Sequence, residues 1–231
     1  MDFRIEDFGE GYVAVIDKPL GWTSSDVVRK IKFALQRKGL RKLKVGHAGT
    51  LDPLATGVLL VCTGKATKRV ESLQAEEKEY VAGIMLGATT PSFDMEHPVD
   101  RTYPTEHITR EAVEQALETL KGERLQEPPL YSAKKIEGVR AYEFARAGED
   151  VQMRKALINI YELELTECRL PEITVRVRCS KGTYIRSLAA EIGQALDSGA
   201  YLTSLRRTRS GGFTAEEAFG LEDFIEKISS L

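Results

Sequence analysis

The sequence predicts a mixed α+β fold, because helix-like and strand-like segments follow one another along the whole chain. The clearest helix pattern lies at residues 109–121, where apolar side chains recur on one face and Gly122 follows. The clearest strand pattern lies at residues 173–179, where apolar and polar side chains alternate. Of the 231 residues, 42% are hydrophobic and 29% are charged, so we expect a globular protein with a real hydrophobic core.

The other elements can be placed in chain order. Residues 11–17 have the pattern of a strand, and Ser24 or Ser25 is expected to cap a helix that stops at Gly39. The apolar stripe of this helix consists of Val27, Val28, Ile31 and Leu35. The remaining elements are expected in this order: a loop at residues 46–57, a buried strand, a short helix near residues 65–73, a strand at residues 78–87, a hairpin within residues 127–141, a helix at about residues 184–196 and a last helix at residues 221–228.

Several classes of protein are disfavoured by composition. The N-terminus does not have the basic and then apolar pattern of a secretory signal, and the longest apolar runs are too short to cross a bilayer. Cys62, Cys168 and Cys179 lack a C-x-x-C spacing, which favours reduced thiols over disulfides or a zinc site. The sequence therefore predicts a soluble, cytoplasmic protein.

Charge is distributed unevenly although the net charge is only −2. Residues 18–44 contain nine Lys or Arg and one acid, and residues 169–209 contain eight Lys or Arg and three acids. Residues 71–127 reverse the balance, with thirteen acids and five bases. The two basic segments could form one face for a polyanion, but charge runs alone more often mark solvated helix faces.

A single carboxylate, Asp52, stands between Leu51 and Pro53 at the start of an apolar run. A carboxylate in that place is partly desolvated, which is costly unless another group pairs with it. Pro53 biases Asp52 toward an extended conformation. Asp52 could be a nucleophile, a general base or a metal ligand, although the segment offers no further metal ligands. It could equally be a residue that only caps a turn.

The stretch GHAGTLDPLATGVL around Asp52 resembles the signature segment of the TruB family of tRNA pseudouridine synthases. Other blocks that resemble this family follow in the family's order. They are IDKPLGWTSSDVV before this stretch, and KEYVAGIMLG, PPLYSAKKIEGVRAYEFAR, CSKGTYIRSLAAEIG and LTSLRRTRSGGF after it. The resemblance covers about residues 11–215. It implies a pseudouridine synthase fold, with a largely antiparallel central sheet flanked by helices and an active-site cleft across the sheet.

The resemblance also implies roles for particular residues. Asp52 corresponds to the catalytic aspartate, and Arg186 to the arginine that pairs with it. Tyr80 corresponds to the tyrosine that stacks on the target base and takes part in proton transfer. Leu205 corresponds to the apolar residue on the other side of the base, and His47 to the histidine that fills the space left when the base flips out.

Other residues are expected to organise the site or to contact RNA. Lys18 lies near the cleft in this family, and Asp94 corresponds to an aspartate that helps to organise the site. We expect residues 18–44, together with Arg176 and Arg178, to supply the basic face that RNA binding requires.

The same resemblance predicts the domain organisation and the partners. Residues 1–231 are expected to form a single catalytic domain, with residues 124–152 as an RNA-contacting insertion. A full C-terminal PUA domain, which many members carry, is not expected. The expected partner is the T-arm stem-loop of tRNA. No membrane association, obligate protein partner, cofactor or metal is expected. The protein is expected to be a monomer.

The implied reaction isomerises uridine 55 in the T loop of tRNA by base flipping, cleavage of the glycosidic bond, rotation of the base and rejoining through C5. Three other functions have to be weighed against it. A non-catalytic RNA-binding protein could lose Asp52, Tyr80 or Arg186, yet all three are present. A guide-RNA-dependent synthase usually relies on a PUA domain and partner proteins. A glycosidase would normally need a second carboxylate beside Asp52.

Overall fold

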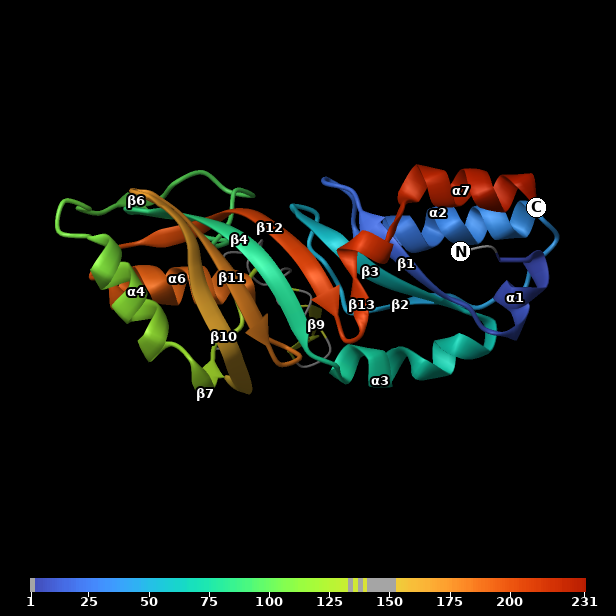
Figure 1. Ribbon diagram of the computed structural model, residues 1–231, viewed down its shortest axis with the longest axis horizontal. Helices are drawn as coiled ribbons and strands as arrows, with labels where there is room; N and C mark the ends of the chain where they lie inside the picture. The colour runs from blue at the N-terminus through green and yellow to red at the C-terminus, as the bar shows by residue number, and fades with distance from the viewer. Residues whose placement is uncertain (1–2, 133–134, 137–138, 141–152) are drawn as a thin grey trace. The chain divides into compact units, whose positions relative to one another are not determined.

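A computed structural model of the chain describes residues 3–132, 135–136, 139–140 and 153–231. These residues form two compact units. The terminal unit consists of Met1–Tyr80 and Leu205–Leu231, and the central unit consists of Val81–Ser204 (Figure 1). Strands β4 (Lys78–Leu86) and β12 (Ala200–Ser210) each contribute residues to both units.

The terminal unit is built on a sheet whose strands run in the order β14-β1-β3-β12. Its strands are β1 (Val13–Lys18), β2 (Val45–Ala48), β3 (Ala55–Thr63), β13 (Phe213–Thr214) and β14 (Phe219–Gly220), together with part of β12. The central pair, β1 and β3, is antiparallel, and β2 pairs with β3. In contrast, β12 runs parallel to β3 and places Leu205 opposite Ala55. This register brings residues 205–207 beside residues 55–57, which follow Asp52 in the chain.

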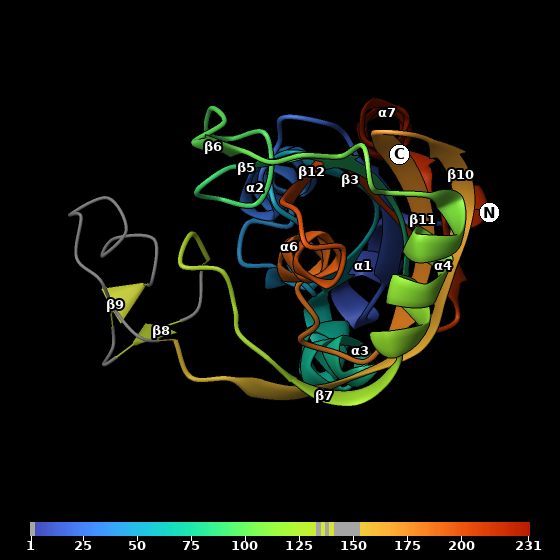
Figure 2. The same cartoon turned by 90° about the vertical axis from the view of Figure 1, so that its left-hand side faces the viewer.

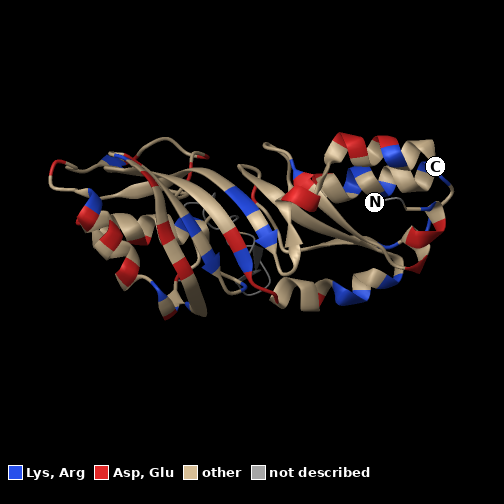
Figure 3. Cartoon of the chain, in the orientation of Figure 1, with Lys and Arg blue, Asp and Glu red and all other residues tan. Residues whose placement is uncertain are grey.

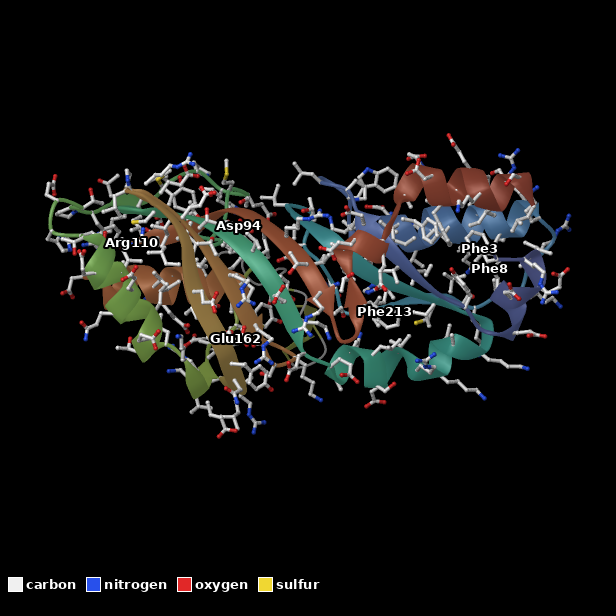
Figure 4. The ribbon with its side chains drawn as sticks, viewed as in Figure 1. Phe3, Phe8, Asp94, Arg110, Glu162 and Phe213 are labelled. Atoms are coloured by element: carbon white, nitrogen blue, oxygen red, sulfur yellow. The ribbon has the colours of Figure 1, made fainter. Side chains whose placement is uncertain are left out.

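Helices cover the sheet of the terminal unit. They are α1 (Ile5–Glu10), α2 (Ser24–Arg37), the 3-10 helix η1 (Gly64–Arg69), α3 (Val70–Ala75) and α7 (Leu221–Ser230). Helices α2 and α7 are in contact, and their buried faces share a core with β1 and β3. Aromatic rings fill this core, where Phe3 and Phe8 pack edge to face with ring centroids 5.2 Å apart (Figure 4).

The predicted N-cap of α2, Ser24 or Ser25, was wrong, because the helix is capped one residue earlier. The cap is Thr23, whose hydroxyl accepts a hydrogen bond from the Asp26 amide while the Asp26 carboxylate accepts one from the Thr23 amide. Ser24 is buried inside the helix, and its hydroxyl bonds to the backbone of Leu51 instead.

The central unit contains a sheet in the order β12-β4-β11-β10-β7. Its further elements are β5 (Ala88–Thr89), β6 (Arg101–Thr102), α4 (Arg110–Thr119), β7 (Gly122–Gln126), β8 (Lys135–Ile136), β9 (Val139–Arg140), β10 (Ala156–Arg169), β11 (Glu172–Cys179) and α6 (Ile185–Ala195). The neighbouring strands β10 and β11, and β10 and β7, are antiparallel. Helix α4 lies against β10 and contacts α6 (Figure 2). The mixed α+β prediction and the largely antiparallel sheet are confirmed.

The strongest local patterns were predicted correctly. In β11 every second residue is buried, as the alternation indicated, and α4 and α6 occupy the expected segments. The expected loop at residues 46–57 was too long, because β2 extends to Ala48 and β3 begins at Ala55. The strands β10 and β12 were not predicted, and β10 carries register shifts that interrupt its alternation.

The expected hairpin within residues 127–141 is present as β8 paired with β9, which places Lys135 opposite Arg140. Residues 137–138, between the two strands, lie outside the described residues, as do residues 141–152 of the expected RNA-contacting insertion. Within the part of the chain that the structure describes, no helix is long and apolar enough to cross a membrane.

Candidate active site

Asp52 lies in a short loop of the terminal unit, residues 49–54, which we call the aspartate loop. The loop connects β2 to β3 and begins with Gly49, whose φ of +85° suits glycine. Asp52 is half-buried, and its backbone carbonyl accepts a hydrogen bond from the Ala55 amide at 3.0 Å. The neighbouring Pro53 carbonyl accepts one from the Gly21 amide at 2.8 Å. The loop is therefore fixed by its own turn and by the segment after β1.

Lys18, at the end of β1, is completely buried under the aspartate loop. Its Nζ donates to the carbonyls of Trp22 at 2.6 Å, Pro19 at 3.0 Å and Pro53 at 3.4 Å. Burial lowers the pKa of Lys18 to about 8, the Asp52 carboxylate opposes this shift, and the Arg207 guanidinium reinforces it. Lys18 thus holds the loop from inside the protein, and the RNA contact expected for it stays a prediction.

Two further side chains bind the aspartate loop, and the sequence patterns pointed to neither of them. Ser24 accepts a hydrogen bond from the Leu51 amide at 2.9 Å and donates one to the Leu51 carbonyl at 3.1 Å. Arg207 is 1% exposed, and its guanidinium donates to the carbonyls of Gly49 at 3.0 Å, Thr50 at 3.5 Å and Val58 at 2.7 Å. One signal could have found Arg207. It follows Leu205 by two residues, and this spacing puts both side chains on one face if the segment is a strand.

The structure places three residues of the predicted base pocket in the terminal unit. His47 lies in β2, Tyr80 is buried in β4, and Leu205 is half-buried in β12 opposite Ala55. Burial, and then the charge of Arg207, lowers the pKa of His47, so the imidazole is neutral near pH 7. Its Nδ1 is enclosed and has no hydrogen-bond partner within the described residues. A neutral, half-buried ring suits a position beside stacked bases.

Arg186 and Asp94 meet in the central unit. Arg186 belongs to the first turn of α6, and Asp94 lies in the loop after β5 (Figure 4). Their side chains are 5% and 9% exposed, and Nη1 of Arg186 lies 3.7 Å from Oδ2 of Asp94. Nη1 of Arg186 also donates to the Ser92 carbonyl at 3.3 Å, and Oδ1 of Asp94 accepts from the Glu96 amide at 3.0 Å. The structure therefore joins two predicted site residues in a buried ion pair.

Asp52 and Arg186 belong to different units, so their expected pairing stays a prediction.

The start of α6, which carries Arg186, is held by Gln126 of β7. Oε1 of Gln126 accepts from the Tyr184 amide at 2.8 Å, and its Nε2 donates to the Tyr184 carbonyl at 3.2 Å. The side chain of Gln126 thus satisfies the backbone of the N-cap residue of this helix.

Arg176 and Arg178 lie on the half-exposed face of β11, as their alternation predicted. Both are paired with carboxylates of β10. Arg176 contacts Glu162 and Glu164 at 3.0 Å, and Arg178 contacts Glu162 at 2.8 Å. Glu162 is labelled in Figure 4. The Arg178 hydrogen bond is the main reason that the pKa of Glu162 is lowered. Their positive charge is locally balanced, and their contact with RNA stays a prediction.

A basic hollow lies on the terminal unit between the end of α2 and η1. Its charged lining residues are Lys32, Arg41, Lys42 and Lys44, and no acid is among the described residues that line it. Figure 3 marks the Lys and Arg of α2 in blue. These four cations belong to the basic segment at residues 18–44 and line the same hollow.

Within the described ranges, no group of three or more His, Cys, Asp or Glu side chains is placed to hold a metal ion.

Comparison with known proteins gives consistent matches over nearly the whole chain. The model of the TruB family pseudouridylate synthase N-terminal domain matches residues 37–185, and the model of the tRNA pseudouridylate synthase B C-terminal domain matches residues 186–230. A tRNA pseudouridine synthase B of Phocaeicola vulgatus is 59% identical over 95% of this chain and 94% of its own. Its counterpart in Bacteroides fragilis is 58% identical over 96% of each.

Among solved structures, that of a Cbf5-Nop10-Gar1 complex contains a chain that is similar in sequence and fold. The identity is 34%, the TM-score is 0.74, and the match covers 97% of the present chain. The present chain spans 56% of the length of that protein.

Proposed function

Because the chain belongs to the TruB family of pseudouridylate synthases, we propose that it is a tRNA pseudouridine synthase that isomerises uridine 55 in the T loop. The observation that carries the proposal is the aspartate loop, in which Asp52 is half-buried on a backbone held by buried side chains. The relatives named tRNA pseudouridine synthase B match this chain nearly end to end. That coverage supports the same reaction on the same class of substrate.

The reaction breaks the C1′–N1 bond of the target uridine, turns the uracil and forms the C1′–C5 bond. The proton on C5 is then lost and N1 is protonated, so the product is an isomer of the substrate. We assign the cleavage of the C1′–N1 bond to the Asp52 carboxylate. It can attack C6 of the ring, attack C1′ of the sugar, or assist elimination to a glycal, and all three routes use one ionised carboxylate.

An enzyme that acts on a base inside folded RNA must extrude that base and shelter it. We assign the stacking contacts to Tyr80 and Leu205, and the space vacated by the base to the neutral ring of His47. We assign the guanidinium of Arg186, which is paired with Asp94, as the partner of the Asp52 carboxylate.

We assign RNA affinity mainly to the basic hollow, whose cations are not balanced by acids in its lining. Lys18, by contrast, is enclosed, and Arg176 and Arg178 contact carboxylates. The substrate element is the T-arm stem-loop of tRNA, and the protein acts as a cytoplasmic monomer without a protein partner.

The test is turnover on unmodified tRNA, with pseudouridine mapped by chemical labelling. We expect one product, at uridine 55, and none on a transcript that carries cytidine there. Asp52→Asn should abolish product while the Kd for tRNA changes by less than about tenfold, or about 1.4 kcal/mol. Substantial turnover by this variant would remove Asp52 from the chemistry.

A second arm separates this function from one that requires a guide RNA or partner proteins, because the similar chain in the Cbf5-Nop10-Gar1 structure belongs to a complex. Purified protein is incubated with an isolated T-arm stem-loop and no other RNA or protein. Turnover close to that on whole tRNA is expected across a salt series. A requirement for an added RNA, a protein or the acceptor stem would contradict the proposal on substrate and partner.

A further inference from the structure

Arg207 has an unusual environment for its residue type. It is the largest of the fully buried side chains in the described residues, although a buried charge is costly unless it is well satisfied. The acceptors that the structure gives its guanidinium are three backbone carbonyls. Two of them, at Gly49 and Thr50, precede Asp52, and the third, at Val58, follows it. One planar cation therefore joins both sides of the aspartate loop.

The local backbone is shaped to let Arg207 approach so closely. Gly57 lies opposite Arg207 in the parallel pairing of β3 and β12 and has a φ of +98°. A Cβ atom built on Gly57 would lie 2.1 Å from the carbonyl oxygen of Arg207, a distance at which no side chain fits. A Cβ on Gly49 would lie 3.4 Å from Nη1 of Arg207. Gly57 thus makes room for the backbone of this strand, whereas a Cβ at Gly49 would only reach contact distance of the arginine.

Ser24, from the N-terminal part of the chain, also binds the backbone of the aspartate loop. Its hydroxyl bonds to both the amide and the carbonyl of Leu51, the residue directly before Asp52. Leu51 is itself buried, so its backbone groups need partners inside the protein. Arg207 and Ser24 lie near opposite ends of the chain, yet both bind the backbone of one short loop.

We propose that Arg207 and Ser24 are positioning residues that hold the Asp52 carboxylate in its reactive orientation. Both side chains are buried and bound to backbone, so we assign neither of them a contact with the RNA. A shift of the loop by about 1 Å would cost about 100-fold in rate, which makes rigid attachment a catalytic requirement. This inference rests on the proposed function for its kinetic test, whereas its structural test is independent of any activity.

Two variants and a matched control separate positioning from simple burial. Arg207→Lys keeps the charge but cannot span both sides of the loop with a planar fork. Ser24→Ala removes the Leu51 contacts while the Thr23 cap of α2 remains. The control is Arg206→Lys, because Arg206 points to the opposite face of β12 and pairs with Asp17 at 2.7 Å and 3.0 Å.

We expect Arg207→Lys to lower kcat by about 100-fold and Ser24→Ala to lower it by about tenfold, with the Kd for tRNA changed by less than about threefold. Arg206→Lys should leave kcat within about twofold of the wild type. Amide hydrogen exchange gives the structural readout. The Leu51 amide should exchange faster in Ser24→Ala and in Arg207→Lys, while amides of α7 stay unchanged.

Wild-type kcat in folded variants would overturn the proposal, and so would an equal loss of tRNA affinity or a kcat loss without faster exchange at Leu51. If Arg207→Lys does not fold, Ser24→Ala decides by the same criteria. If the wild type makes no pseudouridine, the proposed function fails, and unchanged exchange at Leu51 in the variants would separately show that these side chains do not hold the loop.

Discussion

Lys18 offers the sharpest physical test of the interior beneath the aspartate loop. Its side chain is fully enclosed, and burial lowers its pKa from 10.5 to about 8. The folded protein therefore holds this proton less tightly than the unfolded chain does. Between pH 8 and 10.5 unfolding takes up a proton, so the free energy of unfolding rises as the pH increases through this window.

The size of this effect follows from the two pKa values. Each pKa unit corresponds to about 1.4 kcal/mol, so the full contribution is about 3 kcal/mol, of which about 2.5 kcal/mol develops between about pH 7 and about pH 10. Tyr12 and Cys62 act in the opposite direction, because burial raises their pKa values and their folded forms retain the proton. Their contribution cancels when the wild type is compared with a variant that lacks only Lys18.

The assay is urea unfolding of the wild type and Lys18→Met at several pH values from about 7 to about 10. The wild type should gain about 2–3 kcal/mol relative to the variant over this range. Lys32→Met removes an exposed lysine of α2 and should keep the pH dependence of the wild type. Parallel curves for the wild type and Lys18→Met would refute the reasoning, because they would mean that Lys18 is as well solvated in the folded state as in the unfolded one.

Three further predictions concern the site. Asp94→Ala removes a buried carboxylate beside the Arg186 guanidinium and should lower the free energy of unfolding by about 3 kcal/mol, measured by urea unfolding; a loss below about 0.5 kcal/mol would mean that the Arg186–Asp94 pair contributes little to stability. Tyr80→Phe should bind tRNA normally but lose most single-turnover activity, whereas an equal loss of binding would make Tyr80 a recognition residue. Lys42→Glu with Lys44→Glu should reduce the slope of log Kd against log salt by about one unit per lost phosphate contact, and an unchanged slope would place the RNA elsewhere.

The sequence alone identified much of this protein because its strongest signals are local. The periodicities of α4 and β11 arise from which face each element buries, and that information is contained in a dozen or so neighbouring residues. The position of Asp52, between an apolar run and a proline, is likewise a local feature, and it was enough to mark this carboxylate as a candidate. The long strand β10 was missed because its bulges break the alternation on which such predictions depend.

The surroundings of Asp52 were decided only by the tertiary structure. Lys18, Ser24 and Arg207 bind backbone groups of the aspartate loop, and every residue type offers such groups, so no pattern of side chains announces the contact. The Arg207 contact also depends on the register between β3 and β12, which pairs Leu205 with Ala55. These two residues are far apart in the sequence. Lys18 belongs to a basic segment of the sequence, but in the fold it is buried and binds the Pro53 carbonyl of the aspartate loop. The sequence marked Asp52 as the candidate carboxylate, and the fold determined what holds its backbone in place.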